Sequence, residues 1–92
     1  MLSLKDACNI LHVDIGNNDE LITDLCGAIP GYIETTTGYP EDKQDDEPLC
    51  KTVSGFLLTL WYYSDHADDM KLQRVIDNLL KCIAVKARSV TQ

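Results

Sequence analysis

Cysteine and histidine are the first side chains to consider for chemistry in this sequence. The cysteines are Cys8, Cys26, Cys50 and Cys82, separated by 18, 24 and 32 residues, and no two of them form a Cys-x-x-Cys pair. Structural zinc sites usually contain such pairs. Cys8, Cys26 and Cys82 fall on or beside apolar stripes, where cysteine behaves as a small hydrophobic residue. We therefore expect buried free thiols, with no metal and no cofactor.

His66 is the second candidate, because acidic residues flank it. A histidine beside a carboxylate can act as a general base, and Asp65, Asp68 and Asp69 are close in sequence. The segment is typical of a short solvated turn between helices, with no nucleophile or oxyanion donor nearby. We also find no glycine-rich phosphate loop, serine nucleophile elbow or metalloprotease helix. We expect no catalytic residues and no enzyme activity.

A dense acidic segment lies between residues 39 and 48. It lacks the alternating Asp/Asn pattern and the central glycine of a calcium loop, so we expect a solvated, mobile loop. A negative patch of this kind repels DNA and keeps it from sticking. The acidic residues are Glu41, Asp42, Asp45, Asp46 and Glu47.

Charge is unevenly distributed along the chain. The 92 residues, 45% of them hydrophobic, predict a single domain over residues 1–92. The formal charge is −7, but residues 1–70 carry −11 and residues 71–92 carry +4. A net negative chain is repelled by phosphate, which disfavours general nucleic-acid binding. The basic C-terminal part is therefore a candidate binding region.

Neither a leader nor a membrane span is expected. Asp6 and Asn9 interrupt the apolar residues near the start, which argues against a signal peptide. The longest mostly apolar run, from Phe56 to Tyr63, is too short to cross a bilayer. We expect the chain to remain in a cytosol, where its cysteines are reduced.

The spacing of apolar residues predicts an all-α fold, a small bundle of four helices. The first two helices cover residues 4–12 and about 18–38, and Pro48 suits the first position of the third. The fourth has an apolar stripe that runs from Leu72 to Ile83. Asp65 to Asp69 close the third helix and lead into the fourth.

Two of these helices carry an irregularity. Pro30 removes a hydrogen bond inside the second helix and clashes with the preceding turn, so we expect that helix to be kinked or broken near residues 27–31. Lys86 would fall on the apolar side of the fourth helix. We therefore expect that helix to end near residues 84–85, and residues 85–92 to form an irregular tail.

Two helix faces are candidate interfaces. The third helix is apolar on two sides, and its second face holds Lys51, Gly55, Leu58 and Tyr62. That face is either wrapped by the protein itself or left free for another subunit. The fourth helix carries a basic face made of Lys71, Arg74, Lys81 and Arg88. A basic helix that docks on the acidic surface of the next copy makes a head-to-tail contact, which forms a ring when its rotation closes.

Five motifs follow one another in a recognisable order. Their sequences are LKDACNILHVD at residues 4–14, NDELITDL at 18–25, YIETTTG at 32–38, LWYY at 60–63 and VIDNLL at 75–80. This ordered set resembles the head–tail connector family of tailed bacteriophages and prophages, also described as phage DNA-packaging proteins. The resemblance spans roughly residues 2–85. Its most specific pieces are the Tyr-Ile-Glu helix end before Gly38 and the Trp-Tyr pair of the third helix.

The resemblance implies a helical subunit that forms a ring on the portal of a DNA-filled capsid and extends its DNA channel. The implied partners are the portal protein, a stopper or tail-completion protein, and other copies of the chain, which can be monomeric when free. DNA would be only a passing, non-specific contact, and no membrane is involved. The implied locations are the bacterial cytoplasm during assembly and the head–tail interface of the virion.

A second hypothesis stays open beside the connector. The chain would then be a small helical regulatory or protein-interaction module that acts as a homodimer, burying Leu58 and Tyr62 against their counterparts. The symmetry of self-contact separates the two hypotheses. A two-fold contact of the third helix favours the module, whereas a head-to-tail contact of the fourth favours the ring.

Overall fold

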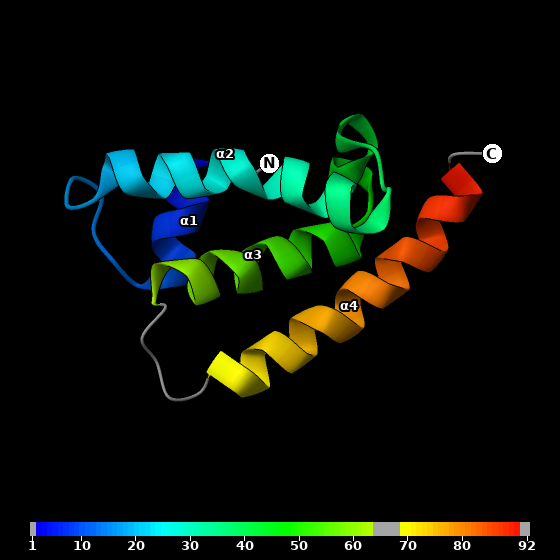
Figure 1. Cartoon of the computed structure of the whole chain (residues 1–92). Helices are drawn as coiled ribbons and strands as arrows, with labels where there is room; N and C mark the ends of the chain where they lie inside the picture. The colour runs from blue at the N-terminus through cyan, green and yellow to red at the C-terminus, as the bar shows by residue number, and fades with distance from the viewer. Residues whose placement is uncertain (1, 64–68, 91–92) are drawn as a thin grey trace.

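Helices make up all the regular structure in the part of the chain that the computed structural model describes, residues 2–63 and 69–90 (Figure 1). The prediction of an all-α bundle is therefore confirmed at the level of fold class. A short 3-10 helix adds to the four α-helices that the sequence predicts. The elements are α1 (Leu4–Leu11), α2 (Asp19–Thr37), η1 (Glu41–Asp46), α3 (Pro48–Tyr62) and α4 (Asp69–Val90).

Local capping sets the ends of the first two helices. The Ser3 hydroxyl accepts a hydrogen bond from the Asp6 backbone N–H at 3.1 Å, which satisfies a free donor at the start of α1. Gly38 ends α2 in the left-handed conformation, with φ of 83°, and its N–H donates to the Glu34 carbonyl at 2.7 Å. Glycine adopts this conformation without steric cost. These ends agree with those expected from the sequence.

Helices α2 and α3 hold the bundle together, because each of them packs against all the other elements. Figure 1 shows α3 running between α2 on one side and α4 on the other. Its side chains Val53, Leu57 and Leu58 are fully buried. Facing them are buried residues of the other helices, including Leu11, Ile22, Ile29, Ile33, Ile76 and Ile83.

Helix α2 is continuous through Pro30, so the break expected near residues 27–31 is not present. Proline has no N–H, and the Cys26 carbonyl one turn earlier therefore lacks its usual helical donor. The apolar positions around it stay in register, because Cys26, Ile29 and Ile33 are all buried. The Pro30 carbonyl also accepts a hydrogen bond at 2.9 Å from the Gln44 side chain of η1. The burial of these apolar residues and the hydrogen bond from Gln44 both hold this helical segment in place.

Helix α4 extends to Val90, which corrects the expected end near residues 84–85 and the irregular tail from residue 85. The Lys86 ammonium does not need to avoid the bundle, because it pairs with the Glu47 carboxylate at 3.0 Å. Ala87, the next residue, is buried in the core. The ion pair and the burial of Ala87 hold the last turns of the helix against the bundle.

The acidic segment is also more ordered than expected. Instead of a mobile loop, Glu41–Asp46 form the 3-10 helix η1, and the Gln44 side chain is buried beneath it. The Gln44 amide donates to the carbonyls of Pro30 and Tyr39, at 2.9 and 3.1 Å. These two bonds attach η1 to the end of α2.

Replacing Pro30 with alanine tests how much strain α2 bears. We expect P30A to raise the free energy of unfolding by about 1–2 kcal/mol, since proline inside a helix costs about 3 kcal/mol and stiffening of the unfolded chain offsets about 1. Urea unfolding measures the change. P48A is the matched control, because Pro48 occupies the first turn of α3, where no hydrogen bond is lost. Destabilisation by P30A would contradict this account.

Candidate functional site

The outer side of α4 carries the four basic residues that the sequence analysis identified. All four side chains are exposed, and we call this surface the basic face: Lys71, Arg74, Lys81 and Arg88. The buried residues Ile76, Leu80, Ile83 and Ala87 lie on the opposite side of the same helix. Because Arg74, Lys81 and Arg88 are seven residues apart, they recur every two helical turns and form one line.

An acidic surface lies on η1 and the adjoining turn of α2. Its members are exposed carboxylates: Glu34, Glu41, Asp42, Asp45 and Asp46. The Glu34 carboxylate accepts a hydrogen bond from the Glu41 backbone N–H at 3.1 Å, which joins the two elements. The one lysine of η1, Lys43, reaches away to the Val90 carbonyl of α4 at 3.3 Å. The surface therefore presents a strongly negative field to solvent.

Glu47 does not belong to this surface, which corrects its inclusion among the exposed acidic residues. Its side chain is buried at the start of α3, where it accepts a hydrogen bond from the Leu49 N–H at 3.0 Å and pairs with Lys86. The backbone hydrogen bond, followed by the Lys86 ammonium, lowers the pKa of this carboxyl group. Glu47 thus acts as a helix cap and a link to α4.

Substituting Glu47 with glutamine should make stability depend less on pH in acid. The lowered pKa of Glu47 means that its stabilising effect is complete above the ordinary value of 4.5 and is lost as pH falls through the folded-state pKa. We expect E47Q to be less stable at pH 7 and to approach the wild type at about pH 3. Urea unfolding across this pH range tests it, with D42N as the exposed control. Curves that stay equally far apart at every pH would contradict the assignment.

The second face of α3 is mostly covered by the chain itself. Leu58 is fully buried in the core, which corrects its assignment to a subunit interface. The Tyr62 hydroxyl accepts a hydrogen bond from the Asn18 side chain at 2.8 Å. A Cβ atom on Gly55 would lie 3.6 Å from the Ile10 side chain of α1. Lys51 alone of the three interface candidates on α3 is exposed.

An apolar groove crosses α3 between α1 and α4, and the sequence analysis missed it. Ile10 from α1, Phe56 from α3 and Leu72 from α4 line this hollow of about 660 Å³. Ile10 and Phe56 are each 36% exposed, which is high for side chains of this size. The signal was present in the sequence, because Phe56 belongs to an apolar stripe broader than the core could bury.

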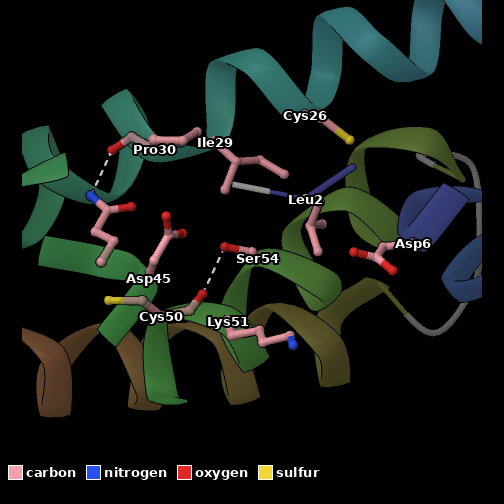
Figure 2. A pocket seen from close by; sticks show the side chains of 10 residues that line it. Leu2, Asp6, Cys26, Ile29, Pro30, Asp45, Cys50, Lys51 and Ser54 are labelled. Atoms are coloured by element: carbon pink, nitrogen blue, oxygen red, sulfur yellow. Dashed lines mark hydrogen bonds between the residues drawn. The ribbon is translucent and has the colours of Figure 1, made fainter. Parts of the chain in front are cut away.

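A smaller cavity of about 250 Å³ lies on the other side of Leu2, which borders both hollows (Figure 2). Cys26 and Cys50 line it together with Ile29 and Pro30. Burial raises the pKa of the Cys50 thiol to about 11, with the Glu47 carboxylate adding to the effect. Burial likewise raises the pKa of Cys26. Both groups are therefore neutral thiols at pH 7, with little nucleophilic character.

The cysteines otherwise differ in one respect from expectation. Cys8, Cys26 and Cys50 are buried and free, whereas Cys82 is exposed on α4. Within the described ranges, no three His, Cys, Asp or Glu side chains are grouped so that they could hold a metal ion. His66 and its neighbours Asp65 and Asp68 lie outside the described residues. Among the helices of residues 2–63 and 69–90, none combines the length and apolar character that a membrane span requires.

A pair of alanine variants distinguishes the buried and exposed apolar residues of α3. We expect L58A to lower the free energy of unfolding by about 2–5 kcal/mol, because it leaves a cavity in the core. F56A should cost clearly less, since Phe56 faces the groove and is partly exposed. Thermal or urea unfolding gives both values. Similar losses for the two variants would mean that the groove is packed as tightly as the core.

The chain was compared with protein-family models, curated proteins and solved structures, and none of the three comparisons gave a match. Function therefore has to be argued from the chain's own residues and surfaces.

Proposed function

We propose that this protein is a structural subunit of a phage or prophage head–tail connector. Copies of the chain would form a ring on the portal protein, extend the DNA channel and receive a stopper or tail-completion protein. The proposal includes no catalysis and no cofactor. It places the chain in the bacterial cytoplasm during assembly and at the head–tail interface of the finished particle.

The observation that carries the proposal is the contact between the motifs on which the resemblance depends. Tyr32 of the YIETTTG motif packs edge to face on Trp61 of the LWYY motif, with ring centroids 5.3 Å apart. Tyr62 of the same motif binds Asn18, the first residue of the NDELITDL motif. Such aromatic pairs contribute about 0.5–1.5 kcal/mol beyond the area that they bury. The residues on which the resemblance rests therefore also fix α2 against α3.

The charged surfaces support the same function. A ring subunit needs two different surfaces that complement each other, and the basic face and the acidic surface differ in sign and location. A DNA channel also works best where its wall is negative or neutral, because contacts that release counterions would hold the DNA. We assign the acidic surface to the subunit contact in the first place, and to the channel wall where carboxylates remain uncovered.

The homodimeric interaction module remains the alternative proposal, but its dimer contact has to use a different surface from the one that the sequence suggested. Leu58 lies in the chain's own core and is not available for a two-fold contact. The groove beside Ile10 and Phe56 is the apolar surface that a partner segment could occupy instead. This reading requires a self-contact centred on α3, whereas the connector requires one that involves the outer side of α4.

Co-expression with the portal protein of the encoding phage or prophage tests the connector function. We expect the two proteins to co-purify, and electron microscopy to find an added ring on the portal. The major capsid protein serves as the control partner and should not be retained. Failure to bind the portal, together with absence of the chain from purified virions, would overturn the proposal.

A further inference from the structure

The basic face of α4 is a solvent-facing helix surface without a mate in the described chain, and we infer that it docks on the acidic surface of a second copy. This inference rests on the proposed function only in that both require copies of the chain to associate. It goes further because it names the two surfaces that meet. The contact is head to tail, so each copy uses its basic face toward one neighbour and its acidic surface toward the other.

The geometry of α4 suits such a contact. The basic face is continuous along α4, because exposed side chains follow one another at steps of three and four residues. They are Lys71, Arg74, Asn78, Lys81, Val85 and Arg88. Val85 is 62% exposed between two cations, which gives the face an apolar centre in its C-terminal half. Two successive cations of the line lie about 10.5 Å apart along the axis, from seven residues at 1.5 Å each.

The acidic surface is opposite in sign to this face and is about as long as one pair of its cations. The six residues of η1 extend about 12 Å at a rise of about 2 Å per residue. One pair of cations on α4 therefore spans the same length as the carboxylates of η1. The Gln44 side chain beneath them is held by two hydrogen bonds, so the carboxylates start from a fixed backbone. A preorganised surface loses less entropy on binding.

The basic face points away from the core of its own chain. The C-terminal end of α4 comes close to η1, where the Val90 carbonyl accepts a hydrogen bond from Lys43, but the four cations lie on the side of α4 opposite its buried residues. The ion pair that links α4 to the start of α3 uses Lys86, which is half-exposed and is not part of the basic face. The outward cations are left for another molecule. DNA is the weaker candidate, because the net charge of −7 opposes its approach.

Two charge-reversal variants test the pairing directly. The first is R74E with K81E, which makes the face of α4 acidic, and the second is D42K with D46K, which makes η1 basic. Each variant alone should self-associate at least about tenfold more weakly than wild type, because like charges then meet. An equimolar mixture should recover association, since each altered surface finds its complement on the other variant. The mixed assembly alternates the two chains.

Sedimentation equilibrium and native mass spectrometry measure association at low and high salt. Wild-type association should weaken as salt rises from about 0.1 M to about 1 M, because the screening length falls from about 10 Å to about 3 Å. K5E with D24K is the matched control, since it reverses two exposed charges outside both surfaces. Circular dichroism checks that every variant folds.

Four outcomes would overturn the inference. Three of them are self-association of the reversed variants as strong as that of the wild type, no recovery in the mixture, and a wild-type chain that stays monomeric at every concentration and salt. The fourth concerns DNA. If R74E with K81E no longer binds a short DNA duplex but still self-associates, DNA is the ligand of the basic face. Portal binding is measured separately, so a chain that binds the portal but fails these tests would refute the charge pairing and leave the connector function standing.

Discussion

The buried carboxylate of Glu47 is the interaction on which the arrangement of the C-terminal half depends. It caps α3 through the Leu49 N–H and holds the Lys86 ammonium of α4 at 3.0 Å. A carboxylate buried without partners would be costly, and these two contacts compensate for its lost hydration. The same ion pair allows a lysine on the bundle side of α4, so that the helix continues through Ala87 to Val90.

This link also decides where the positive charge of the chain is displayed. With Lys86 paired to Glu47 and Ala87 buried, Lys81 and Arg88 lie on the side of α4 opposite Ala87 and point to solvent. The uneven charge of the sequence therefore appears in the structure as two separate surfaces, the basic face of α4 and the acidic surface of η1 and α2. Electrostatic surfaces of this kind determine the choice and orientation of partners more than they add affinity, which suits the head-to-tail contact that we propose.

The interior, by contrast, is arranged for stability and offers little chemistry. The thiols of Cys26 and Cys50 lie beside a cavity of about 250 Å³, but burial keeps them protonated. The aromatic contact of Tyr32 with Trp61 joins α2 to α3. On the outside, the exposed groove beside Phe56 adds an apolar surface to the two charged ones.

The sequence by itself determined the helices and most of their ends, because these depend on residues within one or two turns: the Ser3 cap, the Gly38 stop and Pro48 at a first turn. Only the tertiary structure decided the burial and the partners of four residues: Pro30, Lys86, Glu47 and Leu58. Each of these residues depends on what a distant segment brings to it. Gln44 binds the Pro30 carbonyl, Glu47 neutralises Lys86, and other helices enclose Leu58. Periodicity gives the direction of a side chain along its own helix, whereas burial and pairing depend on how helices far apart in sequence pack together.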